Sequence, residues 1–222
     1  MFKFTGKEAL IFKNKYLVIS DLHIGIEKEL FQKGINIPTQ TNYLLNKIKD
    51  LKEKYNVDRL IIVGDFKHNV PKISLLELKE VPYSVNFLSN LFEKVFILKG
   101  NHDGKLQELI EKRDNIILAK ELRMGNVVFT HGNRRTKFEG DIYVIGHHHF
   151  VKSITTSIGE SFYEKVFVFG FFDEKSVIIL PAFSDLAGYW EVGTFHGPIA
   201  KKIKEYEVYT LDGILIEEVK ID

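Results

Sequence analysis

Short apolar runs separated by polar segments mark the first hundred residues. Ala9–Lys13 and Tyr16–Ser20 are two such runs only two residues apart, which predicts a pair of strands joined by a tight turn. Leu60–Val63 and Val95–Leu98 are continuous apolar runs of four residues, a pattern that favours buried strands. The first part of the chain therefore contains strands that need cover on both faces.

Between these runs, apolar residues recur at helical spacing. One helical face, after Pro38, consists of Leu44, Leu45, Ile48, Leu51 and Tyr55. A shorter face consists of Val85, Leu88, Leu91 and Phe92. We expect a third, short helix at Lys105–Glu111, whereas Lys67–Pro82 shows no regular pattern and is expected to be irregular.

The pattern changes to a series of short strands after about residue 115. These are Ile116–Leu118, Val127–Thr130, Tyr143–Ile145, Val151–Thr155, Val166–Phe169, Val177–Leu180, Tyr206–Tyr209 and Ile214–Val219. Two sheets packed face to face with helices outside would bury all these runs. We therefore predict an α/β fold, a four-layer α-β-β-α sandwich of two mixed sheets flanked by helices. No repeat or linker divides the sequence, so one domain over residues 1–222 is expected.

Composition excludes several classes of protein. The 222 residues contain no cysteine, which excludes disulfide frameworks, thiolate zinc fingers and thiol catalysis. The 31 basic and 30 acidic residues give a formal net charge of +1, so bulk charge shows no bias towards nucleic acid. No apolar run approaches the roughly 18 residues that span a bilayer, and the N-terminus lacks the features of a signal peptide. We expect a cytoplasmic protein with no membrane partner.

Five polar clusters each follow directly after an apolar strand. They are Ser20-Asp21-Leu22-His23, Gly64-Asp65, Gly100-Asn101-His102-Asp103, His131-Gly132 and Gly146-His147-His148-His149. Ligands of open α/β sheets bind at the carboxyl ends of strands. If these strands are neighbours, all five clusters converge on one rim.

The clusters contain the side-chain types that bind divalent metals. Seven candidate ligands are Asp21, His23, Asp65, Asn101, His131, His147 and His149. Without thiolates they suit manganese, which we favour, or iron, zinc, nickel or cobalt. Seven ligands are too many for one catalytic ion with open positions, but they suit two ions roughly 3.5–4 Å apart. Asp65 is the natural bridge because a carboxylate can bind both ions. Such a pair leaves the site cationic, which favours a phosphate substrate.

This ordered set resembles the calcineurin-like metallophosphoesterase superfamily, whose pattern is DxH, GD, GNH followed by D or E, a later H, and GHxH. The resemblance implies a β-sandwich flanked by helices. It implies one metal held by Asp21, His23, Asp65 and His149, and a second held by Asp65, Asn101, His131 and His147. His102 would stabilise the phosphoryl oxygens or protonate the leaving group, and Asp103 would orient His102.

A narrower resemblance covers further segments. Residues 20–25 (SDLHIG), 34–40 (GINIPTQ) and 180–184 (LPAFS) are similar to a bacterial and archaeal subgroup that includes DNA ligase-associated metallophosphoesterases. One position departs from the family pattern, because Asn133 stands where many members carry a second histidine. This departure concerns substrate contacts rather than metal binding.

The remaining histidines and arginines leave alternatives open. His68 would contact the substrate phosphate or a metal-bound water, or else be a solvated loop residue. Arg134 and Arg135 would clamp a phosphate, or else be a solvated pair of charges. We expect a structural role for His148 and a surface position for His196. The phenylalanines of the second half are expected to pack in the core rather than to stack on bases; they are Phe162, Phe167, Phe169, Phe171 and Phe172.

These inferences predict a metal-dependent phosphoesterase with a metal-bridging hydroxide as the nucleophile. A phosphodiester or nucleotide substrate is favoured over a monoester, and the near-zero net charge favours a small substrate over a long polyanion. The alternatives are a nuclease acting on DNA or RNA and a catalytically silent binding module. Lys67–Pro82 and Gly188–Pro198 are the expected walls of the site. Composition and motifs do not indicate an oligomeric state.

Overall fold

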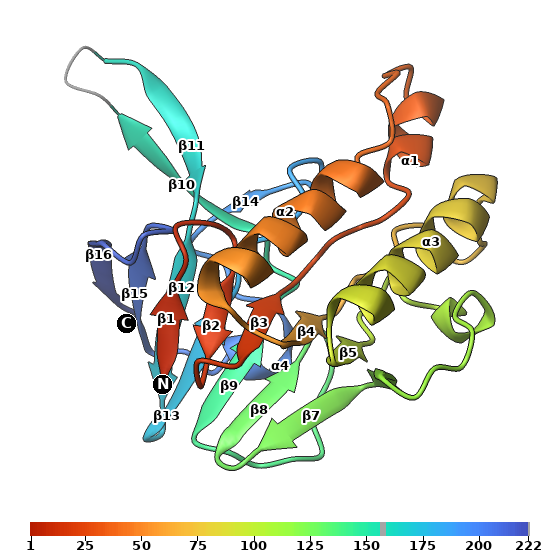
Figure 1. Ribbon diagram of the computed structural model, residues 1–222. Helices are drawn as coiled ribbons and strands as arrows, with labels where there is room; N and C mark the ends of the chain where they lie inside the picture. The colour runs from red at the N-terminus through yellow and green to blue at the C-terminus, as the bar shows by residue number, and fades with distance from the viewer. Residues whose placement is uncertain (156–158, 222) are drawn as a thin grey trace.

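The computed structural model describes residues 1–155 and 159–221, and two large sheets packed face to face form its centre (Figure 1). The first sheet contains, in spatial order, β1 (Phe2–Phe4), β2 (Leu10–Phe12), β3 (Tyr16–Ile19), β4 (Arg59–Val63), β5 (Lys94–Leu98) and β6 (Ile116–Ala119). The second contains β16 (Leu215–Lys220), β15 (Glu205–Tyr209), β12 (Phe167–Phe172), β13 (Lys175–Ile179), β9 (Ile142–Ile145), β8 (Val127–Thr130) and β7 (Glu121–Met124). A small third sheet contains β11 (Ser161–Lys165), β10 (Phe150–Thr155) and β14 (Trp190–Glu191).

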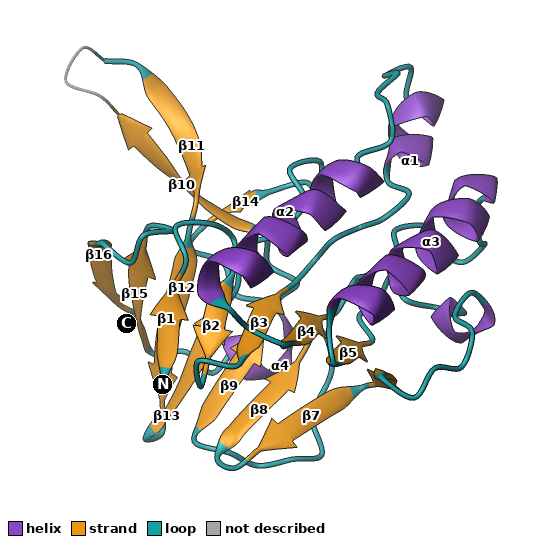
Figure 2. Ribbon diagram, viewed as in Figure 1, coloured by secondary structure: helices purple, strands orange, loops and turns teal. Residues whose placement is uncertain are grey.

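Helices cover the outer faces of the two large sheets (Figure 2). They are α1 (Glu27–Gln32), α2 (Thr41–Tyr55), α3 (Leu75–Leu91), the 3₁₀ turn η1 (Leu106–Glu108) and α4 (Gly197–Ala200). The long helices α2 and α3 pack on the first sheet, while the four-residue α4 packs on the second. The predicted sandwich of two mixed sheets flanked by helices is therefore confirmed. None of the helices in the described ranges is both long and apolar enough to cross a membrane.

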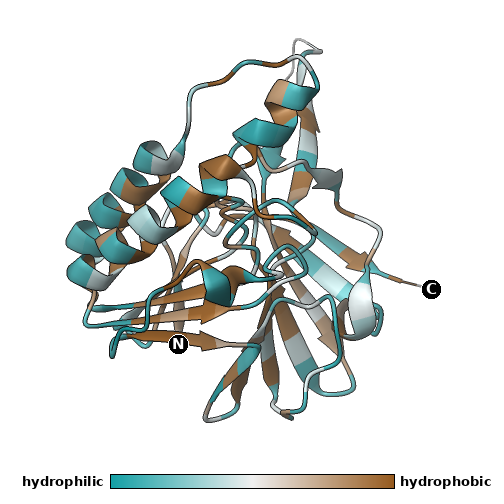
Figure 3. Ribbon diagram, turned by 90° about the vertical axis from the view of Figure 1, so that its right-hand side faces the viewer, coloured by the Kyte–Doolittle hydropathy of each residue, from teal (hydrophilic) through white to brown (hydrophobic). Residues whose placement is uncertain are grey.

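The alternation of side chains along each central strand divides the core into layers. In β4, Leu60 and Ile62 pack towards the helices, whereas Ile61 and Val63 pack between the two sheets. This alternation follows from the two-residue period of a strand, and a strand covered on both faces is apolar throughout. Figure 3 shows the result, since the strands are mainly hydrophobic and the helices carry mixed positions.

Parallel pairing brings the polar clusters to one edge. Strands β3, β4, β5 and β6 run parallel in the first sheet, and β8, β9 and β13 run parallel in the second. The carboxyl ends of β3 and β4 are joined by a hydrogen bond from the Asp21 N–H to the Gly64 carbonyl, 3.1 Å long. Those of β8 and β9 are joined by one from the Gly146 N–H to the His131 carbonyl, 3.2 Å long. The predicted convergence on one rim is therefore observed.

The elements differ from the predictions in the helices and in several short strands. Each predicted strand is present, with its ends shifted by at most three residues. The segment Lys67–Pro82, expected to be irregular, instead enters α3 at Leu75 and continues through Pro82. A capping box of Ser74 and Glu77 fixes this start, and the buried apolar side chains of α3, which pack in the core, offset the cost of a proline inside the helix. The elements β1, β7, β11, β14, α1 and α4 were not predicted, and Lys105–Glu111 contains only the short turn η1.

Candidate metal centre

Five of the seven predicted metal ligands have left-handed backbone conformations. The φ angles are 56° at Asp21, 49° at His23, 48° at Asp65, 73° at His147 and 48° at His149. Such angles are uncommon outside glycine and cluster at functional sites, because only a well-determined surrounding structure maintains them. Here the strand-end loops turn sharply after each strand, and this turn directs the side chains over the rim.

The first group of ligand atoms comes from the loops after β3 and β9. Asp21 Oδ1 lies 3.1 Å from His149 Nε2, and His23 Nε2 lies 3.3 Å from the same nitrogen. The ligand atoms of Asp21, His23 and His149 all lie within 4.8 Å of one another. This is the set that the family resemblance assigns to the first metal, together with Asp65.

The second group comes from the loops after β4, β5, β8 and β9. His131 Nε2 lies 3.1 Å from Asp65 Oδ2 and 3.1 Å from Asn101 Oδ1. The ligand atoms of Asp65, His131 and His147 also lie within 4.8 Å of one another. Asp65 Oδ2 is in addition 3.9 Å from His23 Nε2 of the first group. Asp65 therefore stands between the two groups, as expected of a bridging carboxylate.

The outer nitrogens of the histidine rings are already engaged. His131 Nδ1 donates to the Val63 carbonyl over 3.1 Å, and His149 Nδ1 donates to the Gly188 carbonyl over 2.9 Å. His23 Nδ1 lies 3.0 Å from His68 Nδ1. The Nε2 atoms of His23 and His149 face each other at 3.3 Å. In the neutral tautomers whose Nδ1 atoms donate, both of these Nε2 atoms are unprotonated. Two facing lone pairs repel unless a cation lies between them, so the donor set fits a divalent metal.

The electrostatics of the site favour the metal-binding forms of these groups. Burial lowers the pKa of His23 to about 3, and burial together with the charge of His131 lowers the pKa of His147 to about 4. Burial raises the pKa of Asp21, but the neighbouring His149 and His131 lower it by more, so the net pKa is below its ordinary value. Ionised carboxylates and neutral imidazoles are the states that bind metal.

Two histidines are exceptions in this group. The first is His149: burial lowers its pKa, but the charge of Asp21 and a hydrogen bond to Asp21 outweigh burial and raise the pKa. The second is His131. Burial lowers its pKa, but the hydrogen bond to Asp65 and the charges of Asp65 and Asp21 outweigh burial and raise the pKa to about 9. Without a metal, this ring holds a proton that neutralises the buried carboxylates. A cation in the same place would perform that task.

His102 lies beside the first group of ligands. Its backbone N–H donates to Asp65 Oδ1 over 2.8 Å, and its ring centre is 4.9 Å from that of His23. Its Nδ1 donates to the His68 carbonyl over 2.5 Å, which leaves Nε2 as the ring atom available to a substrate.

The orienting contact that we expected from Asp103 is made instead by that carbonyl. The Asp103 carboxylate is buried and accepts three backbone N–H groups, from Phe66 at 3.2 Å, Lys67 at 3.0 Å and Gly100 at 2.9 Å. These bonds occupy both carboxylate oxygens and tie the loop after β4 to the loop after β5. Burial, and then the charge of Asp65, raises the pKa of Asp103 to about 6.

His68 is also buried, and its ring connects two side chains. Besides its 3.0 Å contact with His23 Nδ1, it places Nε2 2.7 Å from Glu29 Oε2. No sequence motif indicated Glu29, because it lies in α1, outside all five polar clusters. Arg134 donates to the Lys99 carbonyl, and the exposed Arg135 lines a separate pocket beside α4.

His148 points away from the ligand groups, as its alternation with His147 and His149 predicted. Its Nδ1 donates to the Gly146 carbonyl over 3.0 Å, and its Nε2 accepts from the His196 N–H over 3.1 Å. His196 itself is exposed. The segment Gly188–Pro198 therefore contacts the predicted ligand His149 through the Gly188 carbonyl, and it contacts His148 through the His196 N–H.

Close packing explains two motif glycines. A Cβ on Gly100 would lie 2.1 Å from Asp65 Oδ1 and 2.6 Å from the Asp65 nitrogen. A Cβ on Gly64 would lie 2.1 Å from His131 Nδ1. Distances this short are forbidden, so glycine is required where the loop after β5 meets the loop after β4, and where the loop after β4 meets the loop after β8 of the second sheet.

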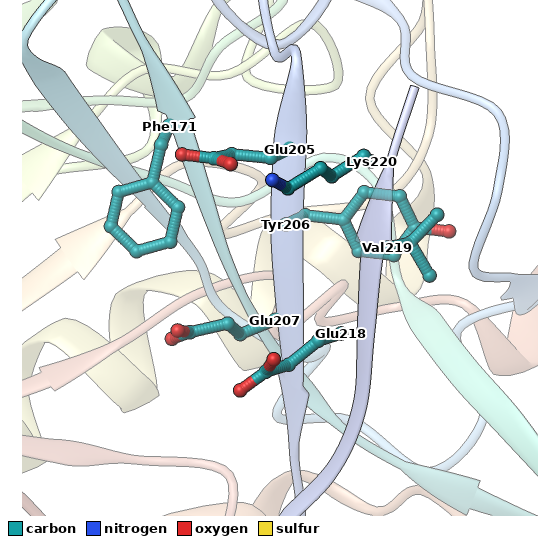
Figure 4. Close-up of a pocket in the computed structure, with 7 residues that line it drawn as sticks. All are labelled: Phe171, Glu205, Tyr206, Glu207, Glu218, Val219 and Lys220. Carbon is teal, nitrogen blue, oxygen red and sulfur yellow. The ribbon is translucent and has the colours of Figure 1, made fainter. Parts of the chain in front are cut away.

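A separate pocket lies on the outer strands of the second sheet (Figure 4). It has a volume of about 340 Å³. Its lining consists of Phe171, Glu205, Tyr206, Glu207, Glu218, Val219 and Lys220. Because this lining includes none of the predicted ligands, the pocket is separate from the metal centre.

Comparison with known proteins identifies the family. The model of the calcineurin-like phosphoesterase family matches residues 15–215. The fold is similar to that of the nuclease MPE of Pseudomonas putida, with a TM-score of 0.62 and 22% identity over 93% of this chain and 90% of that one. YfcE, a phosphoesterase from E. coli, aligns over 93% of this chain and 99% of its own with a TM-score of 0.44 and 16% identity. No curated protein sequence gives a significant match. From its strand-end motifs and the match over residues 15–215, this chain belongs to the calcineurin-like phosphoesterase family.

Proposed function

We propose that the protein is a two-metal hydrolase of phosphodiesters, with a small diester or a nucleotide as substrate and manganese as the favoured metal. The observation that carries this proposal is the position of Asp65, whose Oδ2 lies 3.1 Å from His131 Nε2 and 3.9 Å from His23 Nε2. One carboxylate shared by two groups of ligands is the arrangement of a dinuclear centre.

The chain's own residues have separate tasks in this proposal. Asp21, His23, Asp65 and His149 would hold one cation, and Asp65, Asn101, His131 and His147 would hold the other. Divalent cations supply charge that polarises a phosphoryl group and makes water nucleophilic. His102 would contact a phosphoryl oxygen or the leaving group through Nε2, while the His68 carbonyl holds its Nδ1.

A nuclease is the second candidate. A protein described as a nuclease shares this fold over 93% of the chain. At 22% sequence identity, this similarity supports the same fold but not the same activity. The exposed side chains of Tyr163 and Tyr189, which line a cavity together with His149, add support because nucleobases stack on aromatic surfaces. A silent binding module is less well supported, since all seven predicted ligand positions carry ligating side chains.

The test compares metal content with turnover of bis-p-nitrophenyl phosphate, a diester, and p-nitrophenyl phosphate, a monoester. We expect manganese-dependent hydrolysis that is faster for the diester. Asp65→Ala should lose both bound metal and activity, whereas His102→Ala should keep the metal and lose roughly 10²–10³-fold in kcat. His196→Ala, at an exposed histidine, is the matched control. Full activity of His102→Ala would refute its assignment, and full metal content of Asp65→Ala would refute the dinuclear centre.

A further inference from the structure

Two exposed tyrosines contact each other close to the metal centre. Tyr163 in β11 is 54% exposed and Tyr189, just before β14, is 59% exposed. Their ring centres are 5.2 Å apart and their planes are tilted by 37°. Single exposed aromatic residues are common, whereas contiguous exposed apolar surface is a feature of ligand-binding grooves and interaction sites.

This pair forms one side of a cavity of about 120 Å³ that reaches the metal centre. His149 lines the same cavity, and the Gly188 carbonyl, adjacent to Tyr189, accepts the hydrogen bond from His149 Nδ1. The two tyrosines and a predicted metal ligand therefore line the same cavity. Figure 1 shows the β10–β11 hairpin extending from the body of the protein with β14 beside its base. Tyr163 belongs to this hairpin and Tyr189 directly precedes β14.

The lining of the cavity favours an uncharged flat ring. Val151, Ala182 and Ala187 contribute apolar surface. Lys165 also lines it, but its ammonium group is 3.1 Å from Glu8 and 2.6 Å from Asp185, so its charge is already neutralised. A second phosphate would find no free cation in this lining. The cavity is also smaller than the roughly 300 Å³ of ordinary ligand pockets, which suits one ring system rather than a whole nucleotide.

We propose that this cavity, the aromatic subsite, binds the nucleobase of a nucleotide-containing substrate whose phosphate lies at the metal centre. The proposal rests on the proposed function, because it names the substrate class of that same site. Nucleobases stack on tyrosine with little dependence on sequence, since every base has a π-face. The stacking of one base corresponds to roughly 5- to 150-fold in affinity.

The structural alternative is that Tyr163 and Tyr189 only stabilise the contact between β11 and the segment before β14. This alternative predicts that their removal lowers the melting temperature and affects all ligands equally. A base-binding role predicts a loss confined to ligands that carry a base. A pair of ligands that differ only in the base therefore separates the two roles.

The experiment uses AMP and ribose 5-phosphate with manganese-loaded protein. AMP carries adenine where ribose 5-phosphate carries its anomeric hydroxyl, and the two share the phosphate and the sugar. Isothermal titration calorimetry gives each affinity without requiring turnover. We expect AMP to bind at least about 5-fold more tightly than ribose 5-phosphate. Tyr163→Ala and Tyr189→Ala should remove this preference while the affinity for ribose 5-phosphate stays the same. Tyr163→Phe should retain it, because the ring remains.

Tyr83→Ala is the matched control, since Tyr83 is 46% exposed on α3 and does not line the cavity. Equal binding of AMP and ribose 5-phosphate by the wild-type protein would overturn the proposal. An equal loss of affinity for AMP and for ribose 5-phosphate in Tyr163→Ala would also overturn it. If diester hydrolysis is absent but the preference for AMP holds, the proposed function fails and the subsite stands. If hydrolysis is present without the preference, the subsite fails and the proposed function stands.

A second inference rests on different contacts, those of His68. Its Nε2 is 2.7 Å from Glu29 Oε2 and its Nδ1 is 3.0 Å from His23 Nδ1. When His68 donates to Glu29, its Nδ1 accepts from His23, and this fixes the His23 tautomer that presents Nε2 to a metal. We infer that His68 and Glu29 are positioning residues for the metal ligand His23. This role differs from the substrate contact considered from the sequence.

Manganese affinity, measured by calorimetry on metal-free protein, tests this inference. Glu29→Ala should weaken manganese binding roughly 10- to 100-fold, the usual effect of losing an outer partner of a metal ligand. Glu29→Gln should recover most of the affinity, because its amide oxygen still accepts from His68. Lys33→Ala, which removes the other partner of Glu29, is the control. Unchanged affinity in Glu29→Ala, or an equal loss in Glu29→Gln, would overturn the inference.

Discussion

Glu77 is a side chain whose removal should destabilise the whole protein. It has no exposed surface, and neither does Lys67, whose ammonium group lies 3.6 Å from Glu77 Oε1. The same oxygen accepts the N–H groups of His68 at 3.2 Å and Asn69 at 2.8 Å. The other oxygen accepts the Ser74 N–H at 2.7 Å. One carboxylate thus starts α3, pairs a buried cation and holds the loop that carries His68.

The size of the effect follows from the buried charge. Removing one partner of a buried ion pair costs about 3–5 kcal/mol, because the remaining charge is left without compensation. That is a large share of the roughly 5–15 kcal/mol by which a domain of this kind is stable. We expect Glu77→Ala to lose about 3–5 kcal/mol. Glu77→Gln should lose less, since its amide oxygen still accepts backbone N–H groups.

Equilibrium unfolding of the metal-free protein in urea measures both variants. Glu53→Ala on α2 is the control, because the Glu53 side chain is 60% exposed and its contact with Lys49 is 3.8 Å long. It should change the unfolding free energy by less than about 0.5 kcal/mol. Adding Lys67→Met to Glu77→Gln should restore part of the loss, since the unpaired charge disappears. If Glu77→Ala unfolded at the same urea concentration as Glu53→Ala, the reasoning would be refuted.

Two further predictions concern the rim and the ion pairs behind it. Gly100→Ala should disrupt manganese binding, measured by calorimetry, because its Cβ would lie 2.1 Å from Asp65 Oδ1; unchanged affinity would contradict this. For Glu8, burial raises the pKa, but Lys165 and Lys47 lower it more, so the net pKa is below the ordinary 4.5. The folded state therefore gains stability above about pH 4.5 that is lost as the pH falls through the lower folded value. By calorimetry, Glu8→Gln should melt below the wild type at pH 7, and this gap should narrow at pH 3; a constant gap would contradict the assignment.

The features that could be predicted from the sequence are those that depend on local pattern. A strand covered on both faces must be apolar throughout, so β4 and β5 were found from Leu60–Val63 and Val95–Leu98. A polar cluster after each strand, together with parallel pairing, is sufficient to bring Asp21 and Asp65 to one rim. The resemblance to the family then adds the pairing of particular ligands.

The features that could not be predicted depend on contacts between distant segments. The segment Lys67–Pro82 was expected to be irregular, yet α3 begins within it. Its start is supported by Glu77, whose carboxylate accepts the backbone N–H of His68, nine residues earlier in the chain. Asp103 looked like the residue that orients His102, but three backbone donors from two loops occupy it. Tyr163 and Tyr189 are in contact although they are 26 positions apart in the sequence. The spacing of apolar residues predicts only contacts within one helix or strand, so it could not predict this one.

The left-handed backbone at Asp65 offers a direct measure of how the fold holds the ligands. For an L-residue this conformation costs roughly 1–2 kcal/mol, whereas glycine adopts it freely. Asp65→Ala and Asp65→Gly both lack the carboxylate, so neither should load metal and the two differ only in backbone preference. We expect Asp65→Gly to unfold with a free energy about 1 kcal/mol above that of Asp65→Ala, measured in urea.

Asn101 supplies the control, because it is a predicted ligand outside the left-handed positions. There glycine gains nothing in the folded state and loses more entropy on folding, so Asn101→Gly should be no more stable than Asn101→Ala. If alanine were as stable as glycine at position 65, the φ of 48° would carry no strain. The predicted difference means that the chain maintains the strained ligand geometry without help from the metal. The energy for that geometry then comes from the packed strands and the hydrogen bonds between their loops.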